Sequence, residues 1–319
     1  MLTMRKVLVV YYSQTGQLAD IVDATIAPLR ANADIEVTVS ELKPNKPWPF
    51  PWPFFRFFNT FPETVYEDVE PAEAPGVDPD ADYDLVILAY QVWFLSPSLP
   101  TIAFLKSEGA RKLLAGKPVV TLIGCRNMWL MAQERMKTLI SELGGRLVDN
   151  IVLTDSAHSA FTFVSTPMWM LTGKKGPFLN GLIPEAGVSK EDVAGCARFG
   201  RAIAAALPKR KREDSSPMLG GLGAVTVREG LIESEKTAKR SFMIWGKLLR
   251  ATGTPSSALR QLVIVIYVLF LITLILTVVP LLAIIKALLK PFLKAHVARQ
   301  RAYFAAPSGE SMQLMESPS

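Results

Sequence analysis

The stretch from Val7 to Leu29 constrains the fold of this 319-residue chain more than any other. It opens with four consecutive apolar residues, Val7 to Val10, and a short run of this kind is typical of a strand buried on both faces, as in parallel sheets. A polar turn follows at Ser13 to Gly16, and apolar residues then recur at helical spacing. The sequence therefore predicts a unit of strand, polar loop and helix.

The loop in this unit has the character of a phosphate site. It leads into a helix N-terminus, where unpaired N–H groups and the positive end of the helix dipole attract anions. Neither G-x-G-x-x-G nor G-x-x-x-x-G-K-[ST] is present, so a dinucleotide or a nucleoside triphosphate is not expected. Ser13 and Thr15 are predicted to donate to a phosphate monoester, with Gly16 letting the backbone close around it. The alternative is an ordinary turn with a capping hydroxyl.

The same loop resembles the flavodoxin family, whose first loop reads [ST]-x-T-G-x-T and holds the phosphate of FMN. The positions that correspond are Ser13, Gln14, Thr15, Gly16, Gln17 and Leu18. Leu18 replaces the last Thr of the pattern, so the phosphate would lose one hydroxyl partner. The resemblance implies FMN as cofactor and a flavodoxin-like α/β fold, a doubly wound, five-stranded parallel sheet of order 2-1-3-4-5.

Four further strands are predicted at 35–40, 84–90, 118–123 and 146–154, with helices at 101–108, 130–143 and 188–207. Ligands of doubly wound sheets bind beyond the carboxyl ends of the strands. After the third strand, backbone groups of Gln91 and Val92 are expected at the polar edge of a flavin. Trp93 and Phe94 are expected to stack on its ring, as the resemblance to flavodoxin-like quinone reductases implies; plain packing is the alternative.

The loop after the fourth strand is predicted to complete the site. Gly124 permits a close approach of backbone to ligand. Arg126, or the N–H groups around Asn127, would stabilise charge on a reduced flavin, although Arg126 also suits a surface ion pair. Cys125 and Trp129 belong to the same loop.

An unusual insert, 48–84, separates the second and third strands. Residues 48–61 contain eight aromatic side chains, interleaved with prolines that are expected to forbid a regular helix. Nine carboxylates and no basic residue follow in 63–84. Three interpretations of the aromatic residues are open. They could pack onto their own domain, contact a bilayer interface, or form the wall of a slot for a long apolar substrate.

Residues 155–184 are predicted to form a long loop, and loops of this length are commonly functional. His158 is the one histidine of the globular part and the candidate proton donor or acceptor, the alternative being a hydrogen-bonded loop histidine. No cluster of Cys and His has a metal-ligand spacing, so no metal site is expected. Two cysteines form no disulfide framework and fit a reducing compartment.

Charge divides the chain unevenly. Residues 1–208 contain 19 Lys and Arg against 22 Asp and Glu, whereas 209–301 contain 16 against 5. This distribution does not favour nucleic-acid binding and indicates an anionic membrane surface beside the C-terminal half. The run Leu262–Ile285 has no charged residue and is long enough to cross a bilayer.

These patterns predict a flavodoxin-like domain at 1–208, a basic linker at 209–260, a transmembrane helix at 261–289, and an amphipathic segment with a flexible tail at 290–319. No signal peptide is recognisable before the first strand. We therefore expect a bacterial inner-membrane protein with its globular domain on the cytoplasmic face.

The motifs YYSQTGQL, QVWFLSPSLP, IGCRNMWLMAQE and VDNIVLTD, with a membrane-bound tail, resemble the dialkylresorcinol-condensing enzymes. That resemblance implies a flavodoxin-like aromatase that oxidises an alkylated cyclohexanedione beside a ketosynthase partner. The resemblance to flavodoxin-like reductases implies a homodimer across the flavin. The alternatives are an NAD(P)H-quinone reductase, an electron carrier and a scaffold without cofactor.

Overall fold

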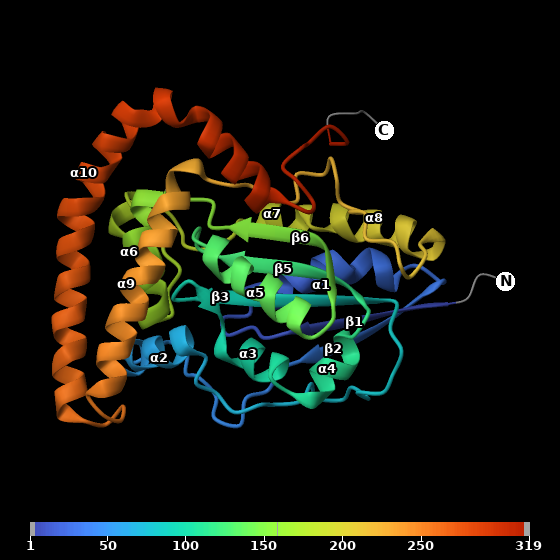
Figure 1. Cartoon of the computed structure of the whole chain (residues 1–319), viewed down its shortest axis with the longest axis horizontal. Coiled ribbons are helices and arrows are strands. Elements are labelled where there is room, and N and C mark those ends of the chain that lie inside the picture. Colours follow the sequence, from blue (N-terminus) through green and yellow to red (C-terminus); the bar gives the residue numbers. More distant parts are fainter. Residues whose placement is uncertain (1–3, 158, 316–319) are drawn as a thin grey trace.

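A computed structural model describes residues 4–157 and 159–315. Five long strands form one parallel sheet in the order β2-β1-β3-β5-β6 (Figure 1). Their bounds are β1 Arg5–Tyr11, β2 Ile35–Glu41, β3 Leu85–Trp93, β5 Pro118–Cys125 and β6 Arg146–Thr154. Val7 to Val10 and Leu85 to Tyr90 are buried, as double-sided covering of a parallel sheet requires.

The predicted order 2-1-3-4-5 differs from this sheet by one strand. Ser96–Pro97 forms an additional strand, β4, which pairs with the end of β3 in antiparallel fashion. Two residues are too few to give an alternating pattern, so β4 has no signal in the sequence. Without it, the long strands follow the flavodoxin-like order, with the switch point between β1 and β3.

Helices cover both faces of the sheet. On one face, α1 (Gln17–Arg30) packs against α7 (Lys190–Gly195) and α8 (Ala197–Ala206), and the other face is covered by α3 (Leu99–Leu105), α4 (Glu108–Leu114) and α5 (Leu130–Glu142) (Figure 1). The single helix predicted over 101–108 is two, because Ser107 ends α3 and caps α4 by accepting from the N–H of Ala110 at 3.0 Å. Short 3-10 turns lie at Leu179–Gly181, Leu207–Lys209 and Glu229–Leu231.

The aromatic insert contains a regular helix, α2 (Phe54–Tyr66), which the expectation from its prolines had excluded. The prolines at 49, 51 and 53 precede the helix, and Pro53 occupies the N-cap with an extended backbone, whereas Pro62 lies inside the helix. A proline at a helix start lacks only an N–H that has no intrahelical partner anyway. The buried face of α2, which includes Phe61 and Val65, supplies the stabilisation.

The loop predicted over 155–184 likewise contains a helix, α6 (Ser159–Thr172). Trp169 on this helix is 7% exposed, so tertiary burial accounts for an element that its sequence alone did not indicate. His158 lies outside the described residues.

The C-terminal half forms two long helices. The predicted linker contains α9 (Ile232–Ala251), and α10 (Ala258–Ala305) continues without a break through the segments predicted as transmembrane and amphipathic. Among the described residues, the part of α10 from Ala258 to Leu282 is long and apolar enough to cross a membrane by length and composition alone. Figure 1 shows α10 running beside α9, bending, and returning towards β6.

Candidate functional site

A cavity of about 200 Å³ lies at the carboxyl ends of β1, β3 and β5. Most of the predicted site residues line it: Gln14, Thr15, Gln17, Leu18, Gln91, Val92, Trp93, Phe94, Gly124, Cys125 and Arg126. Ser13, Gly16, Asn127 and Trp129 are not part of its lining. The cavity is thus assembled from the three strand-end loops that the sequence singled out.

The loop between β1 and α1 has the conformation expected of an anion site. Gly16 precedes α1 with φ 83°, a left-handed value that favours glycine. Ser13 Oγ accepts from the N–H of Ala19 at 3.2 Å, so this hydroxyl caps the helix and keeps its own proton for a ligand. The hydroxyl of Thr15 is buried at the cavity and has no hydrogen-bond partner among the described residues.

Gln17 has a second role that the flavodoxin pattern does not predict. Its side-chain Nε2 donates to the carbonyl of Val188 at 3.1 Å, and its Oε1 accepts from the N–H of the same residue at 3.1 Å. This pair joins the start of α1 to the loop before α7. The side chain of Gln17 is therefore engaged in positioning the phosphate loop.

Aromatic side chains surround the loop after β3. Trp93 packs edge-on against Tyr12, Trp48 and Trp52, with ring centroids 5.5 to 6.0 Å apart. Phe94 adopts φ 48°, a strained value for a bulky residue. Strain at such a position is typical of residues whose placement serves a site.

The loop after β5 brings backbone and charge to the cavity. A Cβ at Gly124 would lie 3.2 and 3.3 Å from the side chains of Ile21 and Leu18, so a larger residue here would push these side chains by a few tenths of an ångström. The guanidinium of Arg126 lies over the ring of Phe163 at 4.4 Å, and burial lowers its pKa. Arg126 lines the cavity together with Asp155, and the two opposite charges attract each other without a direct ion pair among the described residues.

Two residues of this loop serve the core instead. Trp129 is 2% exposed and precedes α5, and Asn127 donates from Nδ2 to the hydroxyl of Thr162 at 3.4 Å. Both support the loop from behind. The expectation that either one touches the ligand has no support from the cavity lining.

The cavity also has walls that the predicted site residues did not include. They are Ile21, Trp52, Phe57, Asp155, Thr166, Trp169, Met170 and Gly187. Burial raises the pKa of Asp155, and the N–H groups of Gly187 and Ala157, which donate to its carboxylate at 2.7 and 2.9 Å, oppose that change. The insert and α6 thus form part of the wall of the cavity. This arrangement agrees with two interpretations of the aromatic residues, packing onto their own domain and forming the wall of a substrate slot.

Helix α9 fixes two of the three loops through side chains on one face. Glu235 Oε2 accepts from the N–H of Met131 at 3.2 Å, and burial raises its pKa to about 8. Four residues on, Lys239 Nζ donates to Ser96 Oγ at 2.6 Å, and burial lowers its pKa to about 8. Glu and Lys four residues apart are common on exposed helix faces. The spacing of Glu235 and Lys239 therefore did not indicate that each binds a residue far away in the sequence.

The residues present fit the phosphate and ring of FMN in their chemistry. Besides Thr15 Oγ1, three more buried polar atoms at the cavity lack a partner among the described residues: Trp52 Nε1, Gln91 Oε1 and Thr166 Oγ1. Ordinary ligand pockets measure ~300 to 1,000 Å³. This one is smaller, and Trp52 and Trp93, whose rings pack against each other, are part of its lining, so that lining would have to move to admit a flavin ring.

No family model and no curated protein matches the chain. The strand order and connections define a doubly wound, flavodoxin-like fold, and the solved structures that it resembles are flavodoxins and other flavoproteins. A flavodoxin from the Archaea is 14% identical, with a TM-score of 0.37, over 64% of this chain and 99% of its own.

Two further solved structures contain FMN. A flavoprotein from Lactobacillus acidophilus in complex with FMN is 14% identical over 46% of this chain and 91% of its own, with a TM-score of 0.36. A Fusobacterium nucleatum flavodoxin bound to FMN is 13% identical over 48% of this chain and 72% of its own, with a TM-score of 0.27. The assignment of the fold rests on the topology described above.

Proposed function

We propose that this chain is an FMN-dependent oxidoreductase that is tethered to a membrane. The observation that carries the proposal is the buried, unpartnered hydroxyl of Thr15, which lies in a glycine-containing loop before a helix N-terminus and opens onto the strand-end cavity. A polar atom left without a partner costs free energy, and a phosphate oxygen at this position would satisfy it.

The protein groups would divide the work of binding. Thr15 and the first N–H groups of α1 would hold the phosphate, with Ser13, which lies outside the cavity lining, beside the same helix start. Gln91 and Gly124 would lie at the polar edge of the ring. Arg126 would balance negative charge. When bound, FMN supplies a two-electron acceptor for a hydride equivalent.

The substrate that we favour is an alkylated 1,3-cyclohexanedione, which would be oxidised to a dialkylresorcinol. Aromatisation removes two hydrogens, one as the acidic proton between the carbonyls and one with the electron pair. Asp155 lines the cavity and His158 is three residues later in the sequence, so these are the candidate proton acceptors. Apolar walls that include Phe57, Trp169 and Met170 suit the alkyl chains. Oxygen or a quinone would take up the electrons.

Partners follow from the same proposal. A ketosynthase would supply the cyclic dione, and the long apolar part of α10 would place the enzyme where alkylated molecules accumulate. A homodimer across the flavin is part of the proposal by resemblance.

Anaerobic turnover tests the reaction. Protein loaded with FMN is mixed with an alkylated cyclohexanedione in the absence of NAD(P)H, and flavin absorbance and resorcinol are measured. One resorcinol for each flavin bleached supports the aromatase. Bleaching that occurs only with NAD(P)H, and that is reversed when a quinone is added as final acceptor, would identify the reductase instead.

A scaffold without cofactor is the second candidate, and the small cavity favours it. Trp52 and Trp93 pack against each other in the lining and narrow the space for a ligand ring, and Leu18 has no hydroxyl for the phosphate. A protein that neither retains FMN through purification nor takes it up afterwards would be this scaffold.

A further inference from the structure

The long apolar helix α10 is fastened to the globular domain at its beginning. Arg260 donates from Nη2 to Glu63 Oε1 at 2.6 Å and to the carbonyl of Asn59 at 2.9 Å, and its side chain is 3% exposed. Two turns further along, the ring of Tyr267 stacks on Phe61 with centroids 4.9 Å apart. The first turns of α10 are thus held against α2.

The other end of the helix is fastened to the same domain. Phe304 is 4% exposed and belongs to the core that surrounds the sheet. Beyond it, Ser308 Oγ accepts from the N–H of Asn150 at 2.8 Å and donates to Asp149 Oδ1 at 2.8 Å. The end of α10 therefore packs beside β6, the strand at one edge of the sheet.

Between its two ends α10 presents a long apolar surface that no described residue covers. The helix rises beside α9, bends and comes back (Figure 1), and only 12% of the most apolar window is buried. The exposed side chains along the rising part are Leu262, Val265, Ile266, Leu269, Ile272 and Leu276. A core helix of a soluble protein would be mostly buried, so this surface has another environment.

A helix that crosses a bilayer leaves its two ends on opposite sides. Here a crossing would pull Phe304 and Ser308 away from β6, exposing an aromatic ring and depriving the buried Asp149 of a donor. We propose that α10 is a re-entrant anchor, which enters the bilayer from the side of the globular domain and returns to it. This inference rests on the membrane tethering in the proposed function and is independent of bound FMN.

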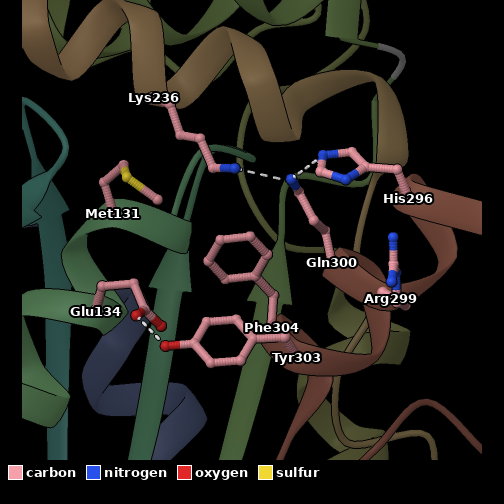
Figure 2. Close-up of a pocket in the computed structure, with 8 residues that line it drawn as sticks. All are labelled: Met131, Glu134, Lys236, His296, Arg299, Gln300, Tyr303 and Phe304. Atoms are coloured by element: carbon pink, nitrogen blue, oxygen red, sulfur yellow. Dashed lines mark hydrogen bonds between the residues drawn. The ribbon is translucent and has the colours of Figure 1, made fainter. Parts of the chain in front are cut away.

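Charge at the returning limb supports a lipid surface as the partner. Figure 2 shows an open pocket of about 530 Å³ where that limb meets α5 and α9. Its basic side chains are Lys236, His296 and Arg299, and Lys236 Nζ donates to Gln300 Oε1 at 2.9 Å. Glu134, the one carboxylate in the lining, accepts from the hydroxyl of Tyr303 at 2.6 Å. Lys236 is also paired with Glu233 Oε1 at 2.9 Å, so the excess of positive charge belongs to the returning limb itself, which has five Lys and Arg and no carboxylate in 286–301. A basic segment beside an apolar helix matches the anionic headgroups of a bilayer.

Labelling of the full-length protein in membrane vesicles tests the re-entrant path. Ser256→Cys and Ser311→Cys place an exposed thiol before and after α10, and a membrane-impermeant maleimide is added to right-side-out and inverted vesicles. The wild type corrects for Cys125 and Cys196. We expect both variants to be labelled in the same vesicle preparation. Labelling in opposite preparations would show a crossing helix and overturn the inference.

Flotation with vesicles of phosphatidylglycerol and phosphatidylethanolamine tests contact with the bilayer. Leu269→Lys with Leu276→Lys should lower the floating fraction by about tenfold, because a charge within the hydrocarbon is costly. Met4→Lys, which alters an equally exposed apolar residue before β1, should float as the wild type does. If the wild type stays at the bottom of the gradient, the tethering itself is wrong. If the wild type floats and the double variant floats equally, α10 is not the anchor.

Discussion

The strand-end loops and helix α9 both shape the cavity, but they do so over different ranges of the chain. The loops place Thr15, Trp93 and Arg126 at the site because each directly follows a strand of the sheet. Helix α9 reaches the same loops from far along the sequence, as Lys239 and Ser96 are 143 residues apart. Lining a site is thus a local property here, whereas holding its loops in place depends on the C-terminal helices.

The largest effect is expected where the C-terminal end is fastened to the sheet. Asp149 is fully buried and accepts from the N–H of Met218 at 2.7 Å, the N–H of Leu219 at 3.2 Å and the hydroxyl of Ser308. Asp149→Ala would leave three donors unpaired and should lower the free energy of unfolding by about 3 kcal/mol. Urea unfolding of the detergent-solubilised protein measures this change.

Asp23→Ala is the matched control, since Asp23 makes only an exposed ion pair with Arg30. It should change the free energy of unfolding by no more than about 0.5 kcal/mol. Equal effects of the two substitutions would mean that the C-terminal end contributes little, and the comparison between loops and helices would lose its basis.

A substitution in the phosphate loop tests the local side of the comparison. Gly16→Val forces a β-branched residue into a left-handed conformation, which costs about 1 to 2 kcal/mol of conformational free energy. The loop should leave this conformation, and the dissociation constant of FMN should rise by about tenfold or more. Gly76→Val places the same residue at φ 71° in the acidic stretch of the insert. If both variants bind FMN equally, the loop before α1 is not the phosphate site.

The two ionisable groups of α9 predict an unusual dependence of stability on pH. Glu235 keeps its proton up to about pH 8 in the folded protein, against 4.5 for an ordinary glutamate, so the free energy of unfolding falls as the pH rises between these values. Lys239 loses its proton near pH 8, against 10.5 ordinarily, so the free energy rises again above pH 8. Unfolding measured from pH 5 to 10 should show a minimum near pH 8.

Single substitutions separate the two limbs of this curve. Glu235→Gln should abolish the fall in the free energy of unfolding below pH 8, and Lys239→Met should abolish the rise above it. Each of these changes with pH is on the order of a few kcal/mol in the wild type. Lys247→Met, which alters an exposed lysine of the same helix, should preserve both limbs. A flat curve for the wild type would show that α9 does not bury these groups.

The aromatic cover should give the smallest effect. Trp52 is 3% exposed, and its ring packs against that of Trp93 in the lining of the cavity, with ring centroids 5.6 Å apart. Trp52→Leu should enlarge the cavity and increase the rate of FMN association by about two- to fivefold in stopped-flow fluorescence. Phe54→Leu alters an exposed ring of the same insert and should leave the rate unchanged. A slower association for Trp52→Leu would mean that Trp52 contributes to binding.

Much of the sheet was predictable because its signals are short-range. The apolar runs of β1, β3 and β5 are contiguous, and the turn Ser13–Gly16 lies directly between a strand and a helix. The elements that the sequence did not predict depend on partners far away in the sequence. Helix α2 becomes stable through burial of Phe61, and the tail at Ser308 is fixed by Asp149, 159 residues earlier. No local pattern contains such information.

The absorbance spectrum of purified protein titrated with FMN, in the wild type and in Thr15→Ala, tests the central claim most directly. The spectrum of a bound, oxidised flavin is expected in the wild type. Its affinity should fall by about ten- to a hundredfold in Thr15→Ala, which loses a hydrogen bond to a charged group. Thr138→Ala, which removes an exposed hydroxyl of α5, should bind as the wild type does. A wild type that takes up no FMN, or a Thr15→Ala variant that binds it equally well, would contradict the assignment of this loop as a flavin phosphate site.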